Sequence, residues 1–431
     1  MLLIYIPKNS ERCQYILELI FKQELGIEYR IVTDQKLFSM HREEKINYSS
    51  SRLPDSFFVN AGPLLFEKEI GQQNIIITQK DQVKVLFTNE HCDLGFDIFS
   101  SVFYMVSRYE EYLPFTPDSH GRFKATDSVA FKHNFLQQPI VNIWIGIFKN
   151  ILQQRFPSLK IKPSSFNAII TYDIDVAYKF KGRSISRTLG ATAKDIFKLK
   201  LKNIYQRPFT LLNIQKDPWD VYSYLRGTAL KANLKPIFFF LVADKSTNDR
   251  NLDYKNPLMK SMVKKVMEFS DIGIHPSYAT TESPEKIATE KKRLEQISGK
   301  KITKSRQHYL KLVLPHTYRS LLAAGITEDY SMGFPDMAGF RAGTCKPFYF
   351  YDLKNEKITR LKIFPVTMME GCFMKNNTDL EQSLREILNL INEVKKVKGT
   401  FVSIWHNHTV SETSEYKAWK KIHDKMIQAI R

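Results

Sequence analysis

The stretch NAIITYDIDVAY, residues 167–178, places two aspartates at the end of an apolar run. The run at 166–172 is short and rich in β-branched and aromatic side chains, which predicts a buried β-strand. Because side chains along a strand alternate with a period of two, we expect Asp173 and Asp175 on the same side. Two carboxylates at so short a distance repel each other unless a cation lies beside them. Either a cation joins the pair, or one aspartate caps the helix that follows.

This run begins a longer pattern in which apolar strands alternate with amphipathic helices, as in α/β folds. We expect strands at 166–172, 236–242, 271–275, 302–306, 340–341, 359–365 and 400–405. We expect helices between them, including 256–270, 284–297, 315–324 and 379–397. Polar side chains follow several of these strands, and the C-terminal strand ends form the active-site face of α/β sheets and barrels. The sequence therefore predicts a site built from several strand ends.

The first part of the chain has a different pattern. It mixes short apolar runs at 2–6, 74–78 and 84–87 with helical patterns at 13–21, 96–112 and 138–154. A chain of 431 residues also exceeds the size at which one core usually stops growing. Turn-forming residues at 156–165 predict the boundary between two units. We expect a smaller N-terminal α/β domain over residues 1–160 and a second domain over residues 161–431.

The composition excludes several classes of protein. With 43% apolar and 25% charged residues, the chain is expected to fold and not to be disordered. The four cysteines are scattered without a Cys-x-x-Cys pair, which argues against disulfide bonds and a cysteine-ligated zinc site. No apolar run approaches the ~18 residues that span a bilayer. The N-terminal apolar patch lacks a preceding basic segment, unlike a signal peptide, so we expect a cytoplasmic protein.

The net charge of +19 favours anionic partners. Much of this positive charge lies in residues 179–216, which contain ten basic residues and one acidic residue, Asp195, among apolar side chains. A basic amphipathic arm of this kind could rest on an anionic membrane surface, which would make the protein peripheral at the inner membrane. A solvated basic surface is the alternative. Zinc-finger spacing, RNA-recognition aromatics and a basic zipper are all missing, so we expect no nucleic acid partner.

Three further segments carry candidate site residues. His275 follows a short apolar run in IGIHPSY, and imidazole with carboxylate oxygen suits Zn²⁺ and similar divalent ions. Arg306 and His308, two residues apart, would share a side in an extended chain. Arg306 could clamp Asp173 bidentately and His308 could complete a three-ligand site, or both could be surface polar residues. The last strand ends in His406-Asn-His, where one imidazole could act as a general acid.

The order and spacing of these segments resemble the polysaccharide deacetylase family, the NodB-homology domain, in a branch with an extra N-terminal α/β domain. The resemblance runs from residue 166 to the C-terminus. The segment TYDID at 171–175 is similar to the family's Thr-Phe-Asp-Asp-Gly motif, and IGIHPSY is similar to its histidine motif. Arg306 matches the arginine motif, the segment 328–331 (Glu-Asp-Tyr-Ser) resembles the fourth motif, and 404–406 (Ile-Trp-His) resembles the fifth.

The chain also departs from the family pattern. Ile174 separates the two aspartates, which are adjacent in the family. Ala279 stands where the family has its second histidine, so we assign that ligand position to His308. The regular segment GFRAGT at 339–344 contains Arg341, which we expect in the pocket lining.

The resemblance implies a distorted (β/α) barrel that removes an acetyl group from an N-acetylated sugar. The substrate would be a cell-surface glycan or its lipid-linked or nucleotide-linked intermediate. A divalent ion, by expectation Zn²⁺, would be held by Asp175, His275 and His308. Asp173 would be the general base, kept ionised by Arg306, and His406 the general acid. The expected substrate contacts are Arg341, Trp405, Tyr278 and Asp329. The alternative is an inactive glycan-binding or membrane-peripheral protein on the same fold, which the missing histidine at Ala279 favours.

Overall fold

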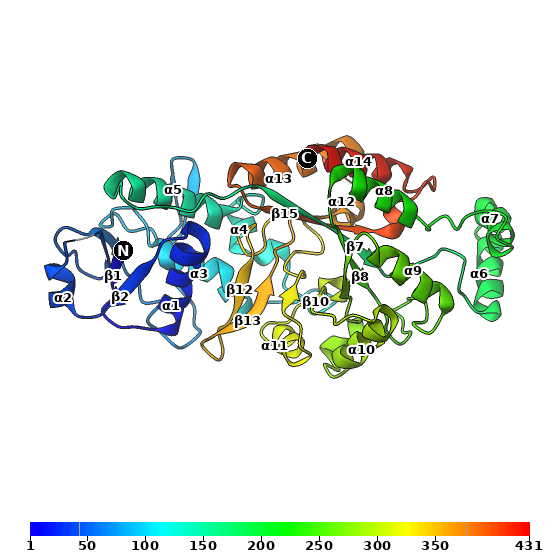
Figure 1. The fold of residues 1–431 in the computed structure, drawn as a ribbon, viewed down its shortest axis with the longest axis horizontal. Helices are drawn as coiled ribbons and strands as arrows, with labels where there is room; N and C mark the ends of the chain where they lie inside the picture. The colour runs from blue at the N-terminus through cyan, green and yellow to red at the C-terminus, as the bar shows by residue number, and fades with distance from the viewer. Residues whose placement is uncertain (43, 377) are drawn as a thin grey trace.

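The computed structural model describes residues 1–42, 44–376 and 378–431. A four-stranded sheet near the N-terminus and a nine-stranded sheet follow one another along the long axis of the molecule (Figure 1). Helices surround both sheets, so the expected mixed α/β class is confirmed.

The N-terminal sheet consists of parallel strands in the order β2-β1-β3-β4. These strands are β1 (Leu2–Tyr5), β2 (Tyr29–Val32), β3 (Lys45–Ser49) and β4 (Phe57–Asn60). The main helices of this region are α1 (Glu11–Leu17), which continues as a π-helix (Glu18–Leu25), α3 (Ile98–Val106) and α5 (Ile140–Arg155). Phe21, Phe99 and Phe148 from these helices pack with ring centroids 5.9–6.0 Å apart, and Phe57 of β4 joins them. Aromatic side chains thus fasten the helices to the sheet.

The smaller elements of this region are short helices and a hairpin. They are α2 (Gln35–Met40), the hairpin β5 (Thr78–Lys80) with β6 (Val83–Val85), and α4 (Val129–Lys132). Of the apolar run at 74–78, only Thr78 lies in a strand. The helix expected over 96–112 ends as α3 at Val106, because Arg108 adopts a left-handed conformation with φ of 55° and a 3₁₀ helix (Tyr109–Tyr112) follows.

The larger sheet has the order β12-β13-β11-β10-β9-β8-β7-β15-β14. Its ladders are parallel except for the antiparallel pair β12–β13. The strands are β7 (Asn167–Ile174), β8 (Ile237–Phe240), β9 (Asp271–Ile274), β10 (Lys304–Ser305), β11 (Glu328–Asp329), β12 (Phe348–Asp352), β13 (Lys357–Ile363), β14 (Met368–Met369) and β15 (Thr400–His406). The expected barrel is not confirmed, because no ladder between described residues joins β12 to β14 and the sheet stays open.

Most helices follow the strands in the order that the sequence predicts. They are α6 (Ile185–Phe197), α7 (Leu201–Leu211), α8 (Tyr222–Ala232), α9 (Pro257–Met267), α10 (Lys286–Ser298), α11 (His316–Ala323), α12 (Glu370–Lys375), α13 (Leu380–Lys396) and α14 (Lys417–Ala429). The expected strand at 340–341 is wrong. That segment is a loop, in which Gly339 and Gly343 adopt positive φ values of 143° and 65°.

Residues from both parts of the chain meet in a partly buried contact. Arg12 of α1 donates to Glu356, and the Tyr15 hydroxyl donates to the Tyr349 carbonyl at 2.7 Å. A single apolar cluster runs from Leu2 to Ile430. The domain boundary near residue 160 therefore stays a prediction.

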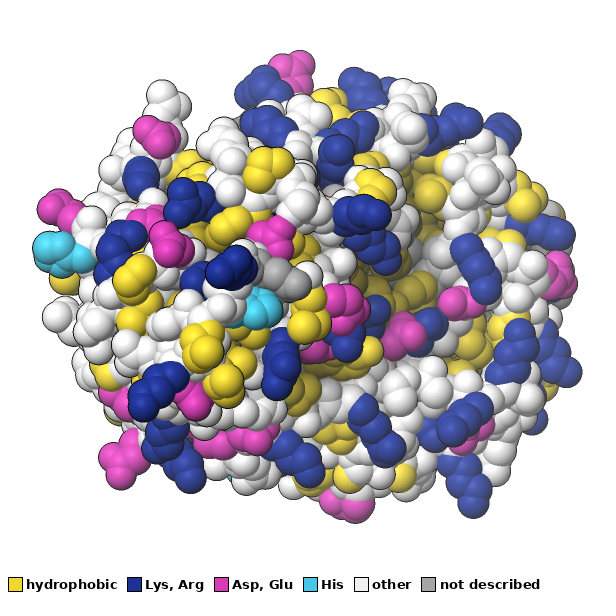
Figure 2. Space-filling view, turned by 60° about the vertical axis from the view of Figure 1, so that its left-hand side comes forward, with side chains coloured by type: hydrophobic (Ala, Val, Ile, Leu, Met, Phe, Trp, Pro, Cys, Tyr) yellow, Lys and Arg dark blue, Asp and Glu magenta, His cyan; other side chains and the backbone are white. Residues whose placement is uncertain are grey.

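Two surface properties bear on the expected partners. Among the described residues, no helix combines the length and apolarity needed to cross a bilayer. On the face in Figure 2, lysine and arginine side chains are scattered among acidic ones and form no continuous stripe. The expected absence of a nucleic acid partner stays a prediction.

Candidate metal and catalytic site

A cavity of about 640 Å³ lies at the C-terminal ends of the central strands. The parallel register of β7, β8, β9 and β15 brings these strand ends together. Among the lining side chains are those predicted to do chemistry: Asp173, Asp175, His275, His308 and His406. The predicted convergence of distant segments on one site is confirmed.

Asp175 is the centre of this cluster. Its Oδ1 lies 3.3 Å from Nε2 of His275, and its Oδ2 lies 3.7 Å from Nε2 of His308 and 3.6 Å from Nε2 of His406. Asp173 Oδ2 also lies 3.8 Å from Nε2 of His275. The two aspartates therefore face the same side, as the strand period predicts.

Hydrogen bonds on the far side of the rings orient two of the imidazoles. His275 Nδ1 lies 2.5 Å from the Arg306 carbonyl oxygen, and His308 Nδ1 lies 2.9 Å from Asp249 Oδ1. If Nδ1 donates its proton in each case, the Nε2 lone pair is free to bind a metal. Asp249 comes from the loop after β8, and no sequence motif marks it.

The residues fit a divalent cation. One ligand atom each from Asp175, His275 and His308 can be chosen so that all three lie within 4.8 Å of one another. Asp175 Oδ1 is buried without a hydrogen bond and lies 3.3 Å from Nε2 of His275, so an atom that needs a partner faces that histidine. A carboxylate oxygen with two imidazole nitrogens is a donor set that suits Zn²⁺ and similar ions.

The electrostatics of the cluster also favour positive charge. Burial alone would raise the pKa of Asp175, but His308, His275 and His406 lower that pKa well below its usual range. Burial would lower the pKa of His308, but Asp175 and Asp249 raise it to about 9. Because the carboxylates draw protons onto neighbouring imidazoles, the same field would attract a metal cation.

Arg306 lies beneath the cluster and has no solvent-exposed surface. Its Nη1 donates to Asp173 Oδ1 at 2.9 Å and to Thr171 Oγ1 at 2.5 Å, and its Nε donates to the Tyr330 carbonyl at 2.9 Å. The predicted pairing of Arg306 with Asp173 is confirmed. The expected bidentate clamp is wrong, because the Nε donor reaches the backbone and not the second carboxylate oxygen.

His406 has a partner that the sequence does not reveal. Glu370 Oε1 lies 2.8 Å from His406 Nδ1 and accepts from the Thr409 hydroxyl at 2.8 Å. Burial would lower the pKa of His406, but Glu370, Asp175 and Asp173 raise it to about 10. The Glu370 carboxylate therefore favours the protonated form of His406. Glu370 directly follows the two-residue strand β14, which is too short for a periodicity signal.

Three of the expected substrate contacts are wrong, because their side chains are buried away from the cavity. Trp405 faces the opposite side of β15 from His406 and packs on His423 at 4.9 Å between ring centroids. Asp329 accepts hydrogen bonds from the hydroxyls of Ser305 and Ser331. Arg341 forms an ion pair with Glu111 and reaches no solvent.

Residues of the N-terminal region line the cavity as well, which sequence reasoning missed. His120 and Arg122 lie on its wall, and Arg122 donates to the Tyr309 carbonyl at 2.6 Å. The Tyr278 hydroxyl lies 3.1 Å from Nδ1 of His120, but Tyr278 is not among the lining residues, so its expected substrate contact stays a prediction. These contacts depend on chain folding between residues more than 150 positions apart, which no local pattern encodes.

Comparison with known proteins gives a family only for the N-terminal region. Residues 2–157 match a family of unknown function, DUF7033. No curated protein sequence matches this chain.

Solved structures similar to the chain lie at low identity. A protein from Mycobacterium smegmatis, assigned by its description to the polysaccharide deacetylases, is 13% identical, with a TM-score of 0.40; the match covers 62% of this chain and 85% of that one. A CE4-family pseudoenzyme from Bacillus anthracis is 8% identical, with a TM-score of 0.33 and 62% of each chain covered. A de-N-acetylase from Aggregatibacter actinomycetemcomitans is 12% identical, with a TM-score of 0.22, covering 39% of this chain and 88% of that one. These structural neighbours are deacetylases and a pseudoenzyme. Likeness this distant assigns no activity to the present chain.

Proposed function

We propose that this protein is a metal-dependent hydrolase that removes an acetyl group from an N-acetylated sugar, in a cell-surface glycan or its biosynthetic intermediate. The observation that carries the proposal is the position of Asp175. Its carboxylate lies 3.3, 3.7 and 3.6 Å from Nε2 of His275, His308 and His406, which come from three separate segments. Clusters of ionisable side chains with shifted pKa values beside an open cavity are typical of catalytic sites.

Asp175, His275 and His308 are the residues that would hold the ion, by proposal Zn²⁺. Such an ion polarises an acetyl carbonyl and makes a nearby water molecule a better nucleophile. Asp249 would keep the His308 ring in its binding orientation, since its carboxylate accepts from Nδ1.

Asp173 is the proposed general base. Its Oδ2 faces His275, while its Oδ1 is held by Arg306 at 2.9 Å. Oδ2 is therefore the oxygen that would accept a proton from the attacking water. The Arg306 contact fixes the rotamer of Asp173 and balances its negative charge inside the protein.

His406 is the proposed general acid. Its Nδ1 is held by Glu370, so its protonated Nε2 faces the cavity and could donate to the sugar nitrogen as the C–N bond breaks. The nitrogen would otherwise leave as an unstable anion.

The walls of the cavity suit a sugar ring. Its volume of about 640 Å³ is within the usual range for small-molecule sites. His120 and Tyr309 line it, and Tyr278 packs against both rings, with centroids 5.0–5.7 Å apart in this group. Such rings offer apolar faces with polar tips, a combination that suits the mixed surface of an acetylated sugar.

The test is acetate release from glycans that contain N-acetylhexosamine. We expect release by the purified protein, its loss after treatment with a chelator, and its recovery when Zn²⁺ is added. Asp173→Asn should lower the rate ~10²–10⁴-fold while the metal content stays unchanged. Asp244→Asn is the matched control, because Asp244 also follows a strand but is exposed and pairs with Arg293.

Two results would contradict the proposal. A protein that binds no divalent ion at all would exclude this mechanism. A protein that binds the ion but releases no acetate from a broad panel of glycans would favour an inactive glycan-binding protein on the same fold.

A further inference from the structure

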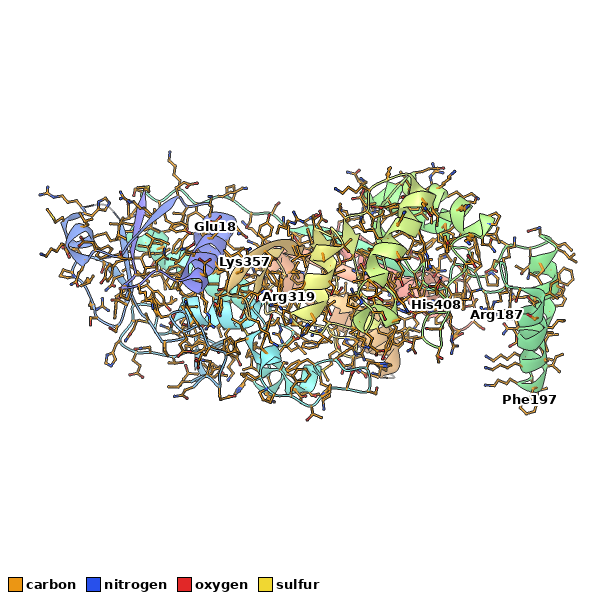
Figure 3. All side chains as sticks on the ribbon, turned by 90° about the horizontal axis from the view of Figure 1, so that it is seen from below. Glu18, Arg187, Phe197, Arg319, Lys357 and His408 are labelled. Carbon is orange, nitrogen blue, oxygen red and sulfur yellow. The ribbon has the colours of Figure 1, made fainter. Side chains whose placement is uncertain are left out.

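Residues 179–216 form an arm that projects from the body of the protein. Its two helices, α6 and α7, stand at one end of the molecule (Figure 1). Figure 3 shows Phe197 at the extremity of this arm. No residue of α6 is buried, and only Arg207 and Thr210 of α7 are. The body of the protein therefore covers almost none of the arm.

The arm places its polar and apolar side chains the opposite way from an ordinary helical hairpin, in which apolar side chains fill the contact between the helices. Asp195 of α6 forms an ion pair with Arg207 of α7 and accepts a hydrogen bond from Asn203. Polar groups thus occupy the contact between the two helices. Large apolar side chains instead face outward: Ile185, Leu189, Ile196, Phe197, Leu199, Leu201, Tyr205, Leu211, Leu212 and Ile214 are all exposed.

An exposed apolar surface of this extent is typical of an interaction site. Phe197 and Leu199 are 89% and 79% exposed, which is among the highest values for apolar side chains in the described part of the chain. Because removing apolar surface from water is favourable, the arm suits a partner that offers an apolar environment.

The charge of the arm indicates which partner that is. At its tip, Lys198, Lys200 and Lys202 alternate with Phe197, Leu199 and Leu201. The single acid of the arm, Asp195, is already paired with Arg207. Alternating apolar and cationic side chains match the acyl boundary and the anionic headgroups of a lipid bilayer, where long lysine side chains reach back to the phosphates.

We propose that this arm docks the protein on the surface of a bilayer that contains anionic lipids. Phe197, Leu199 and Leu201 insert below the headgroups, and the neighbouring lysines bind lipid phosphates. The arm lies on the bilayer and does not cross it.

A basic groove connects the arm to the catalytic cavity. It is lined by Lys181, Arg183, Arg187, Lys245 and Arg250, and it shares Val176, Thr247 and Arg250 with the cavity. Among the described residues that line the groove, Asp249 is the only acidic one, and its carboxylate lies within hydrogen-bond distance of His308 Nδ1. If the proposed deacetylase function holds, the groove would accept phosphate groups that link an acetylated sugar to a lipid in the same bilayer.

Vesicle co-sedimentation of the full chain tests the docking. We expect binding to phosphatidylcholine vesicles with 30% phosphatidylglycerol, weakened by salt, and little binding to pure phosphatidylcholine. Reversal of the tip charges by Lys198→Glu, Lys200→Glu and Lys202→Glu should weaken binding ~100-fold or more. The apolar variant Phe197→Glu with Leu199→Glu should also abolish it.

The matched controls are Leu37→Glu and Met40→Glu, which change exposed apolar residues of α2 and should leave binding unchanged. Circular dichroism and the melting temperature establish that each variant folds. Equal binding to neutral and anionic vesicles would overturn the proposal. So would an arm-dependent oligomer in solution without vesicle binding, which would make a second copy of the chain the partner.

Activity measurements separate this proposal from the proposed function. Asp173→Asn should bind vesicles like the wild type, so docking is measurable even if the protein releases no acetate. With an active enzyme, the arm variants should keep the rate on a soluble acetylated sugar and lose ~10-fold or more on the same sugar anchored to vesicles through a lipid phosphate. Equal rates on both substrates in wild type and arm variants would overturn the role of the arm in substrate access.

Discussion

Glu370 and His406 form a pair in which one carboxylate oxygen fixes both the ring and the backbone of the histidine. Oε1 of Glu370 lies 2.8 Å from His406 Nδ1 and accepts from the His406 backbone N–H at 2.8 Å. Glu370 has no exposed surface, so its charge acts on the imidazole at low dielectric. This pairing occupies Nδ1 and leaves Nε2 as the ring nitrogen that can act on a substrate.

Glu370→Gln should weaken the general acid. Loss of the carboxylate charge lowers the pKa of His406, which Glu370 helps to raise to about 10. Because the charge of Glu370 favours the protonated ring, the variant should lose activity at a lower pH than the wild type. We expect kcat at pH 8 to fall ~10-fold or more. The measurement is the pH profile of kcat for acetate release, with the exposed Glu381→Gln as control. If kcat fell at the same high pH in the variant and in the wild type, the proposed role of Glu370 would be contradicted.

Asp249→Asn should weaken metal binding without removing a ligand. Asp249 accepts from His308 Nδ1 at 2.9 Å and from the backbone N–H of Tyr278 at 3.0 Å. Loss of the carboxylate leaves the His308 ring less well oriented, and we expect an affinity for Zn²⁺ that is ~10–100-fold lower. Competition with a chromogenic chelator measures this change. Asp253→Asn is the control from the same loop, and equal affinities in both variants would exclude the orienting role.

Arg341→Leu should destabilise the fold, since Arg341 holds the N-terminal region to the larger sheet. Its Nη2 and Nε donate to the two oxygens of Glu111 at 2.7 and 2.9 Å, and Arg108 also contacts Glu111. Removal of Arg341 leaves the negative charge of the buried Glu111 carboxylate less well neutralised. We therefore expect the free energy of unfolding to fall by ~3–5 kcal/mol.

Chemical denaturation measures the Arg341 effect. Arg226→Ala is the control, because Arg226 forms an exposed pair with Glu268 at 3.4 Å and should cost less than ~1 kcal/mol. Equal losses in the two variants would show that the buried pair does not join the two regions.

Glu290→Gln should change how stability depends on pH. Burial raises the pKa of Glu290 to about 7, from a usual value of 4.5. Its carboxyl group contacts the backbone N–H and the hydroxyl of Ser277 at 2.9 and 2.6 Å. Because the folded state holds a proton that the unfolded chain releases, the stability from this group is full below pH 4.5 and is lost as the pH rises through 7.

We therefore expect the stability of the wild type relative to Glu290→Gln to fall by about 2 kcal/mol between pH 5 and pH 8. Urea denaturation at a series of pH values measures the difference. The exposed Glu285→Gln should show no such trend. A constant difference between wild type and Glu290→Gln would mean that Glu290 does not bind the proton in the folded state.

Local patterns in the sequence were sufficient to place the main strands and the aspartate pair. The period of two in a strand puts Asp173 and Asp175 on one side, and both lie within 3.8 Å of His275 Nε2. The apolar run at 400–405 likewise predicts β15 with His406 at its end. These features depend on neighbours in the chain, so they can be read from the sequence.

The resemblance to a family was less reliable for the surrounding residues. Trp405 and Asp329 lie in the segments similar to the family motifs, and Arg341 lies in a regular glycine-containing segment, yet all three side chains are buried. Trp405 shows the reason most simply. It precedes His406 on β15 and therefore points to the opposite face, against His423.

By itself, the sequence determined the α/β class, the strand ends that carry His275 and His406, and the basic apolar arm, because each follows from short-range periodicity and composition. Only the tertiary structure decided that Asp249 and Glu370 orient the imidazoles, that His120 and Arg122 complete the cavity, and that the apolar side of the arm faces outward. Those contacts join residues that are distant in the chain, and the order in which strands and helices pack sets them.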